Sequence, residues 1–339
     1  HGRSEAPPYF RAIPGDWETK SDAHTPATSH EQVSLLLKKS LENHEWRQRR
    51  CINLIPSEMT QSSLVRLLQV TDPCGRYAEH KELLAAFEQE IFYYQGTEFI
   101  AWAEDRLVEE MQKFLGYPLV ETRVISGQMA NMTIFSALVD FINRTDRRSE
   151  PRRIPLVMNN HIGKGGHLSS QPMGALRDYI SKDPVTEKYS VINFPVLEDN
   201  PYSIDLNETA NLLDRFNPEL IILGKSMILH PEPVAEIRKM LETKTSRPVI
   251  MYDMAHVLGL IGPHFQDPYA EGADIITGST HKTFYGSQRG VIGARYEEGV
   301  PEYELWKAIE RRVFPGAVSN HHLGTLLGLL MAAIEMNAF

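Results

Sequence analysis

The chain has 339 residues, of which 42% are hydrophobic and 23% charged, as in a globular protein with a sizeable core. This composition excludes a disordered, collagen-like or small disulfide-stapled protein, and the length alone suggests about two domains. The 35 Lys and Arg residues are outnumbered by 44 Asp and Glu, a net charge of −9 that argues against a nucleic-acid partner. The 2 cysteines make no disulfide framework, so we expect a reduced, cytoplasmic protein.

The two ends of the chain have different patterns. Residues 1–30 are polar, show no apolar period and contain no signal-peptide core, so we expect a flexible arm. Residues 323–334 are the longest apolar run, but a run shorter than about 20 residues predicts a buried helix and no membrane span. Residues 31–50 predict an amphipathic helix, whose apolar positions are Val33, Leu36, Leu37 and Leu41.

From about residue 120 the chain alternates short, β-branched apolar runs with stretches of helical period. The apolar runs are residues 123–125, 156–158, 191–194, 220–223, 249–252, 274–277 and 291–294, and the helical stretches include 129–142, 206–216 and 234–243. This alternation predicts an α/β fold with a mostly parallel sheet and helices on both faces. Ligands of such sheets bind at the carboxyl ends of the strands, so the residues after each run are the candidates for a site.

Polar residues follow several of these runs. Residues 126–128 stand between a run and a helix, where free N–H groups and the helix dipole can bind a phosphate. Residues 159–168 form a glycine-rich loop with two histidines, and residues 253–256 and 278–283 bring further acidic, imidazole and hydroxyl groups. Every one of these stretches places polar groups where this fold binds a ligand.

Metal and nucleotide sites are not expected from these loops. The histidines are His161, His167, His256 and His281, and none of them forms the H-E-x-x-H pair of a catalytic zinc site. The glycines at residues 163–166 lack the G-x-x-x-x-G-K-[ST] frame of a P-loop.

Lys282 follows a predicted strand in a loop of small hydroxyl residues. A lone lysine is usually a solvated surface residue. A buried lysine, however, has a lowered pKa and can form a Schiff base with a carbonyl. Asp253 could hold a pyridinium nitrogen protonated, and residues 126–128 could bind a phosphate. A lysine, an acidic partner and a phosphate cradle are what a pyridoxal phosphate enzyme requires of its protein.

Short motifs run in a fixed order from about residue 40 to the end of the chain. They are N-L-I-P-S-E at 53–58, R-Y-A-E at 76–79, Y-Y-Q-G at 93–96, S-G-Q-M-A-N at 126–131, G-G-H-L at 165–168, D-M-A-H-V at 253–257, T-H-K-T at 280–283 and V-F-P-G at 313–316. In this order they resemble the motifs of the serine hydroxymethyltransferase family of fold-type I pyridoxal phosphate enzymes. The resemblance implies the large domain of that fold, with a mostly parallel seven-stranded sheet.

The resemblance also implies roles around the cofactor ring. Lys282 would form the Schiff base with pyridoxal 5'-phosphate, and Asp253 would pair with the pyridine nitrogen. His167 would stack on the ring, while His256 and Ser226 would lie near its hydroxyl.

The implied phosphate site is a second group of residues. Ser126, Gly127 and Gln128 would bind the phosphate, with help from Ser279 and His281.

On the substrate side, Glu79 would be the acid or base beside the substrate hydroxyl. Ser57, Tyr77 and Tyr94 would line the pocket, partly from a neighbouring subunit. The resemblance therefore implies a homodimer or a dimer of dimers with the active site at the subunit interface.

The sequence departs from the family at the entrance and the phosphate site. Residues 80–92 replace a short loop, and the composition of residues 81–88 predicts a helix there. The family's G-P-R-G-G segment corresponds to G-S-Q-R-G at 286–290, where the arginine is shifted by one position. The family's Q-G-G segment is replaced by V-S-N at 318–320. These changes favour a specialised enzyme similar to threonine or fluorothreonine transaldolase, which passes the glycyl unit of threonine to another aldehyde without folate.

Two alternatives remain open. A folate-dependent serine hydroxymethyltransferase, with tetrahydrofolate as a second cofactor, would also retain Glu79, Leu168 and Tyr94. A catalytically silent, cofactor-binding subunit is disfavoured, because the lysine, aspartate and histidine of the motifs are all present.

The motifs divide the chain into four expected segments. These are a flexible arm at 1–30, a helical segment with the entrance at 31–120, the cofactor domain at 121–315, and at 316–339 the start of a helix that leads to a small C-terminal domain. In the family that domain supplies an arginine for the substrate carboxylate, and we identify no residue of this sequence for that role. The length then corresponds to one large domain and its appendages.

Overall fold

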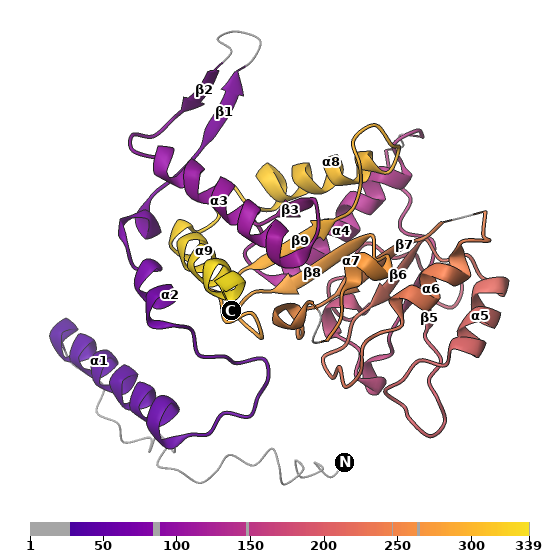
Figure 1. Cartoon of the computed structure of the whole chain (residues 1–339), viewed down its shortest axis with the longest axis horizontal. Coiled ribbons are helices and arrows are strands. Elements are labelled where there is room, and N and C mark those ends of the chain that lie inside the picture. Colours follow the sequence, from indigo (N-terminus) through magenta and orange to yellow (C-terminus); the bar gives the residue numbers. More distant parts are fainter. Residues whose placement is uncertain (1–27, 84–88, 147–148, 246, 263–264, 339) are drawn as a thin grey trace. The chain divides into compact units, whose positions relative to one another are not determined.

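The computed structural model describes residues 28–83, 89–146, 149–245, 247–262 and 265–338 (Figure 1). The chain divides into two compact units, His1–Ile55 and Pro56–Phe339. Most of the arm expected at residues 1–30 lies outside the described residues.

The first unit contains the predicted N-terminal helix. Helix α1 (Ser29–Glu45) continues into a π-helical turn, η2 (Trp46–Arg50). Thr28 caps it: the Thr28 hydroxyl accepts a hydrogen bond from the Glu31 N–H, and the Glu31 carboxylate accepts one from the Thr28 N–H. The predicted apolar side chains lie on this helix but are exposed, and none of its residues is buried. Among the described residues of this unit, the helix therefore has a capping box but no buried side chain.

The second unit is built on a seven-stranded sheet with the order β3-β9-β8-β7-β6-β4-β5. Strands β5, β4, β6, β7 and β8 are parallel, whereas β9 runs antiparallel to both β8 and β3. The strands are β3 (Leu119–Glu121), β4 (Val157–Asn159), β5 (Val191–Asn193), β6 (Leu220–Leu223), β7 (Val249–Asp253), β8 (Ile275–Ser279) and β9 (Gly290–Ala294). The predicted mostly parallel sheet is confirmed.

The strand predicted at residues 123–125 is wrong, because β3 lies earlier and ends at Glu121. The Glu121 carboxylate accepts hydrogen bonds from the Arg123 N–H at 2.7 Å and from the Arg123 guanidinium. These local contacts turn the chain out of the sheet and toward Ser126, which begins the next helix.

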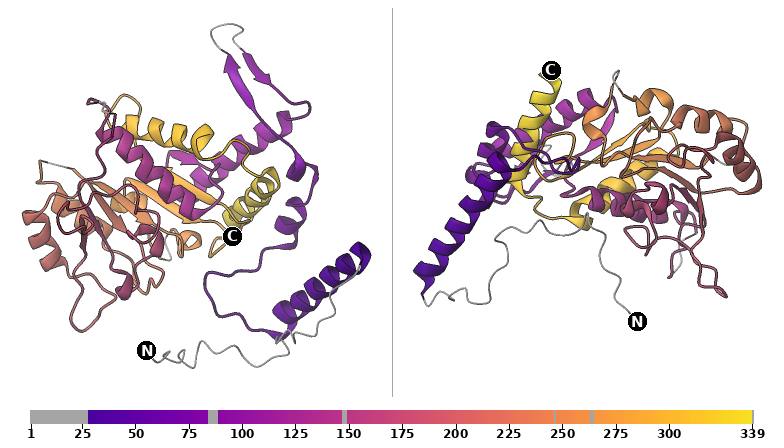
Figure 2. Two further views of the ribbon diagram at one scale, coloured as in Figure 1. Left: turned by 180° about the vertical axis from the view of Figure 1, so that it is seen from behind. Right: turned by 90° about the horizontal axis from the view of Figure 1, so that it is seen from below.

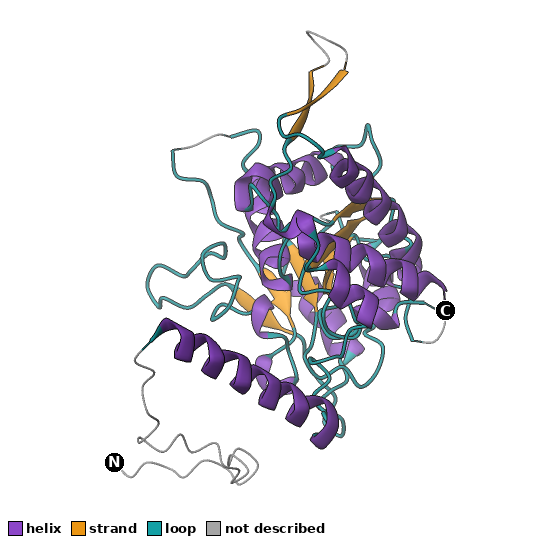
Figure 3. Cartoon of the chain, turned by 90° about the vertical axis from the view of Figure 1, so that its left-hand side faces the viewer, coloured by secondary structure: helices purple, strands orange, loops and turns teal. Residues whose placement is uncertain are grey.

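Helices cover both faces of the sheet, as predicted (Figures 2 and 3). Alternate residues of β6 show this, since Ile221 and Leu223 belong to one hydrophobic core and Leu220 and Ile222 to the other. The first core is completed by α3 (Glu98–Leu115), α5 (Leu206–Arg215), α6 (Val234–Leu241) and α9 (Leu323–Ala338), and the second by α4 (Gly127–Ile142) and α8 (Tyr303–Arg311).

Shorter helices connect these elements. The α-helices are α2 (Ser63–Leu68) and α7 (Pro268–Glu271), and the 3-10 or π turns are η3 (Asp72–Gly75), η4 (Ile162–Lys164), η5 (Leu168–Ser170), η6 (Leu258–Leu260) and η7 (Arg312–Ala317). Two of them, η4 and η5, lie in the glycine-rich loop that follows β4.

The helix predicted at residues 81–88 is also wrong over its described part, residues 81–83. The structure has a two-stranded antiparallel hairpin here, β1 (His80–Leu83) and β2 (Gln89–Phe92), with residues 84–88 outside the description (Figure 1). The strand-forming residues Ile91 and Phe92 favour β structure, and pairing with residues 80–83 satisfies their backbone groups. Composition over a short window missed this longer-range pairing.

The apolar run at residues 323–334 forms a largely buried helix, α9, as predicted. It packs against α2 and α3 in the first core. Among the described helices, none has both the length and the apolar character to cross a membrane.

Candidate active site

The candidate site lies at the carboxyl ends of β4, β6, β7 and β8, beside the N-terminus of α4 (Figure 1). The parallel strands bring their carboxyl ends to one edge of the sheet, and the polar stretches found in the sequence follow them there.

Asp253 is the last residue of β7 and is 2% exposed. Its Oδ2 accepts hydrogen bonds from Asn131 Nδ2 at 2.8 Å and from His167 Nδ1 at 2.5 Å, and its Oδ1 accepts one from the Ala255 N–H. Burial by itself would raise the pKa of Asp253, but His167 and these hydrogen bonds hold the pKa below its usual range. The carboxylate is therefore ionised at neutral pH.

Asn131 was part of a sequence motif, but its role was not predicted. Its amide is buried, donates to Asp253 and to Ser169, and accepts from the Thr277 hydroxyl. A polar residue at a core position of a helix was the signal that could have singled it out. It fixes the orientation of the Asp253 carboxylate.

Lys282 is half-buried in the turn after β8. Its Nζ lies 3.1 Å from His256 Nε2. Burial lowers the pKa of Lys282, and the charge of Asp253 offsets this in part. Thr280 holds the turn against the start of β9, since its N–H donates to the Arg289 carbonyl at 3.0 Å and its hydroxyl accepts from the Arg289 N–H at 3.0 Å.

His256 connects Lys282 to the rest of the cluster. Burial, followed by the nearby charge of Lys282, lowers the pKa of His256 to about 4, so its ring is neutral at pH 7. The ring centroids of His256 and His167 are 5.3 Å apart in an edge-to-face contact. Lys282, His256, His167 and Asp253 thus form one continuous group of side chains in contact.

The N-terminus of α4 provides a place for an anion. Ser126 caps the helix by accepting from the Met129 N–H at 3.1 Å, which leaves the first-turn N–H groups of Gly127 and Gln128 without intrahelical acceptors. A Cβ at Gly127 would collide with Ser279 Oγ, so the two residues approach closely because Gly127 has no side chain. Gln128 is exposed.

Two further predicted residues border this region. His281 is half-buried, and burial, followed by the charge of Lys282, lowers its pKa. Ser226 follows β6 by three residues and is half-buried, and its N–H donates to the Gly165 carbonyl at 2.8 Å. In the part of the chain described, no group of three or more His, Cys, Asp or Glu side chains is placed to hold a metal ion.

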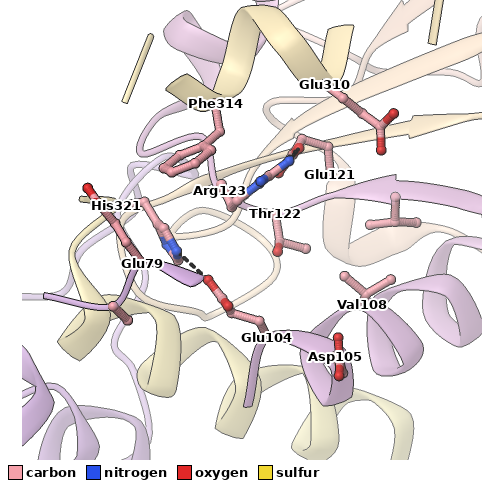
Figure 4. Close-up of a pocket in the computed structure, with 12 residues that line it drawn as sticks. Glu79, Glu104, Asp105, Val108, Glu121, Thr122, Arg123, Glu310, Phe314 and His321 are labelled. Atoms are coloured by element: carbon pink, nitrogen blue, oxygen red, sulfur yellow. Dashed lines mark hydrogen bonds and ion pairs between the residues drawn. The ribbon is translucent and has the colours of Figure 1, made fainter. Parts of the chain in front are cut away.

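Glu79 lies in a different place, a pocket of about 350 Å³ that contains none of the residues predicted to contact the cofactor (Figure 4). Glu104, Arg123 and His321 also line it, and His321 Nε2 lies 2.5 Å from the Glu104 carboxylate. Burial, and then the charge of Glu121, raises the pKa of Glu310 at its edge. Glu79 and Lys282 therefore do not line this pocket together.

The remaining predicted pocket residues are near the surface. The rings of Tyr77 and Tyr94 are 5.6 Å apart and both are exposed, and Ser57 is half-buried. Asn320, in the V-S-N segment, donates to the Arg76 carbonyl at 3.0 Å.

The comparisons with known proteins decide the family. The family model described as serine hydroxymethyltransferase matches residues 30–337. The chain belongs to the serine hydroxymethyltransferase family. It is 37% identical to the serine hydroxymethyltransferase of Archaeoglobus fulgidus over 300 residues, which are 88% of this chain and 60% of that protein. It is 35% identical to that of Pyrobaculum aerophilum over 309 residues, 91% of this chain and 64% of that protein.

A solved structure has the same fold. The crystal structure of L-threonine transaldolase from Pseudomonas fluorescens, in its internal aldimine state, superposes with a TM-score of 0.70 at 24% identity and covers 91% of this chain and 63% of that one. The chain thus spans less than two thirds of the length of these relatives. Membership of the serine hydroxymethyltransferase family confirms the family that the sequence motifs predicted.

The residues present fit pyridoxal phosphate. Nδ1 of His256 and Nδ1 of His281 are buried without a hydrogen-bond partner among the described residues, as expected where a polar ligand binds. The open N-terminus of α4 suits a phosphate, Lys282 suits an aldehyde and the ionised Asp253 suits a protonated ring nitrogen.

Proposed function

We propose that this protein cleaves and re-forms the Cα–Cβ bond of a β-hydroxy-α-amino acid. One observation carries the proposal: Lys282, His256, His167 and Asp253 form one connected group at the sheet edge, beside a helix N-terminus open to a phosphate. Pyridoxal phosphate, when bound, supplies an aldehyde for amines and a ring that accepts the electron pair released at Cα.

Lys282 is the nucleophile in this proposal. Its lowered pKa increases the fraction of neutral amine at a given pH, and only the neutral amine attacks a carbonyl. His256 does not take its proton, because the pKa of His256 is about 4. Instead, His256 Nε2 accepts a hydrogen bond from Nζ and orients the amine.

Asp253 holds a proton at the ring nitrogen in this proposal. Its charge is maintained by His167 and Asn131, which also fix the direction of its oxygens. A buried, fixed carboxylate stabilises developing positive charge more than a solvated one does, because it needs no reorganisation.

We propose that Glu79, together with Ser57, Tyr77 and Tyr94, reaches into the site of a second copy of the chain. There Glu79 would lie beside the hydroxyl of the bound substrate. Glu79 lines a pocket that contains none of the Lys282 group, and this supports a site made by two chains, and so a homodimer. Glu79 would take or return the hydroxyl proton while the Cα–Cβ bond breaks or forms.

We propose the threonine transaldolase reaction as the specific activity, in which threonine and a second aldehyde give a new β-hydroxy amino acid and acetaldehyde. The support is the paired strands β1 (His80–Leu83) and β2 (Gln89–Phe92), which stand where the family's short entrance loop is expected. Folate-dependent hydroxymethyl transfer is the second candidate, because the relatives compared above are named serine hydroxymethyltransferase.

One assay separates the two candidates. The protein loaded with pyridoxal phosphate is given L-threonine and an aromatic aldehyde without folate, and acetaldehyde is measured by a coupled dehydrogenase. The proposal expects release of acetaldehyde that depends on the second aldehyde. If the protein instead cleaves serine in a tetrahydrofolate-dependent reaction and releases no acetaldehyde from threonine, the activity is hydroxymethyl transfer and the transaldolase proposal is wrong. If neither reaction occurs, the result supports a catalytically silent subunit.

A further inference from the structure

A buried ion pair lies beside the candidate site and has no part in the chemistry described so far. The side chains of Lys225 and Glu232 are 2% and 3% exposed, and Lys225 Nζ lies 2.6 Å from Glu232 Oε1. Desolvation makes a buried ion pair no more stabilising than apolar residues of the same size, so stability alone does not explain this pair.

The pair is held in place by several directional contacts. Lys225 Nζ also donates to the Tyr202 carbonyl at 2.7 Å, and Asn160 Nδ2 donates to the other carboxylate oxygen of Glu232. The backbone of Glu232 is bound by the side-chain amide of Gln266, which accepts from its N–H at 3.1 Å and donates to its carbonyl at 2.6 Å. Glu232 is therefore a fixed anchor for Lys225 and Asn160.

Both partners of Glu232 belong to loops that form the candidate site. Asn160 begins the glycine-rich loop after β4, and Asn160 Oδ1 accepts from the Gly224 N–H at 2.8 Å. The two neighbours of Lys225 in the chain bind the same loop. The Gly224 carbonyl accepts from the His167 N–H at 3.0 Å, and the Ser226 N–H donates to the Gly165 carbonyl at 2.8 Å.

We propose that Lys225 and Glu232 are positioning residues that join the β6 loop to the β4 loop and so fix Ser226 and His167 at the cofactor. The inference rests on the proposed function, because it takes Ser226 and His167 as cofactor contacts. His167 in turn binds the Asp253 carboxylate, so the ion pair also determines how that carboxylate is held.

The test replaces both charges by apolar side chains of similar length, Lys225→Met with Glu232→Met. Removing both partners avoids an unpaired buried charge, so we expect the double variant to fold. We expect faster amide hydrogen exchange at His167 and Ser226 in the cofactor-free protein. We also expect a dissociation constant for pyridoxal phosphate that rises about tenfold, the effect of losing one well-placed hydrogen bond.

A matched control breaks an ion pair at the opposite end of the sheet. Arg238 binds Asp274, which precedes β8, with a nitrogen to oxygen distance of 2.6 Å. Arg238→Met should lower the unfolding temperature without changing exchange at His167 and Ser226 or the dissociation constant. Lys225→Arg, which keeps the charge opposite Glu232, should retain most of the wild-type affinity that the double variant loses.

The inference is wrong if the double variant binds pyridoxal phosphate as tightly as the wild type, or if exchange at His167 and Ser226 does not change. If the double variant does not fold, Glu232→Gln is measured in the same way and has to meet the same two criteria. A wild-type protein that binds no pyridoxal phosphate would instead refute the proposed function.

Discussion

Burial affects the pKa of each titratable residue of the candidate site differently. Asp253 is almost fully buried yet remains ionised, because His167 and Asn131 compensate for its desolvation. Lys282 and His256 have no comparable compensation, so burial lowers the pKa of both. The result is a fixed negative charge next to an amine that loses its proton more easily than a solvated lysine.

The role of Lys282 is tested by Lys282→Ala. We expect the rate of β-hydroxy amino acid cleavage to fall at least about 100-fold, because the nucleophile is lost. Binding of pyridoxal phosphate should persist, since the contacts of Asp253 and the α4 N-terminus remain, and equilibrium dialysis measures it. Lys164→Ala, at an exposed lysine in the glycine-rich loop, is the control and should react at the wild-type rate. Wild-type turnover in Lys282→Ala would remove this residue from the mechanism.

The charge of Asp253 predicts a pH-dependent contribution to stability. Its pKa in the folded protein lies below the unfolded value of about 3.9, so the charged form contributes stability that is fully present above that pH. This contribution is lost as the pH falls through the folded pKa. Asp253→Asn should therefore cost about 2 kcal/mol near neutral pH, and less as the pH falls below about 4. Urea unfolding of both proteins from pH 3 to 7 measures the difference, and a constant difference would contradict it.

At the scale of elements, Arg289 joins three parts of the fold. It is fully buried just before β9, and burial lowers its pKa to about 10, so it is charged at neutral pH. Its guanidinium donates to the carbonyls of Thr122, after β3, and of His321, before α9, and also to His321 Nδ1. His321 therefore accepts at Nδ1 and donates from Nε2 to Glu104 in the pocket of Figure 4.

Arg289→Met should destabilise the protein by about 3 kcal/mol, because it leaves buried carbonyl groups without donors. The urea midpoint of the cofactor-free protein measures this change. Arg312→Met is the control, since Arg312 pairs with Asp140 at the surface and its loss should cost less than about 1 kcal/mol. Equal effects of the two substitutions would show that burial of Arg289 has no special importance.

At the scale of the whole molecule, we predict that two chains share each active site, because Glu79 lines a pocket that does not contain the Lys282 group. Glu79→Gln and Lys282→Ala should each be inactive alone. After the two are mixed, unfolded and refolded together, a mixed dimer would contain one intact site. We expect about a quarter of the wild-type activity from random pairing of equal amounts. No recovery, with dimers present by analytical ultracentrifugation, would show that Glu79 acts within its own chain or not at all.

The sequence by itself predicted the elements whose signal is local. The runs at β6 and β7 are apolar over their whole length because both faces of a central strand are buried, and Ser126 caps α4 from the adjacent position. Lys282, Asp253, His167 and His256 could be predicted together because Asp253 ends a strand and the other three follow strands at the same edge of the sheet. The errors at residues 81–83 and 123–125 arose where a neighbouring strand or side chain, rather than composition, decided the backbone.

Only the tertiary structure decided which charged groups are buried and what they contact. Lys225 and Glu232 look like ordinary surface residues in the sequence, as does Arg289, yet packing between loops and helices removes all three from water. The partners of the Arg289 guanidinium are more than thirty residues away from it in the chain, and only the structure shows that Glu79 lines a pocket without Lys282. Local patterns determined strands, caps and motif residues, whereas burial and pairing depend on long-range contacts that a short stretch of sequence does not contain.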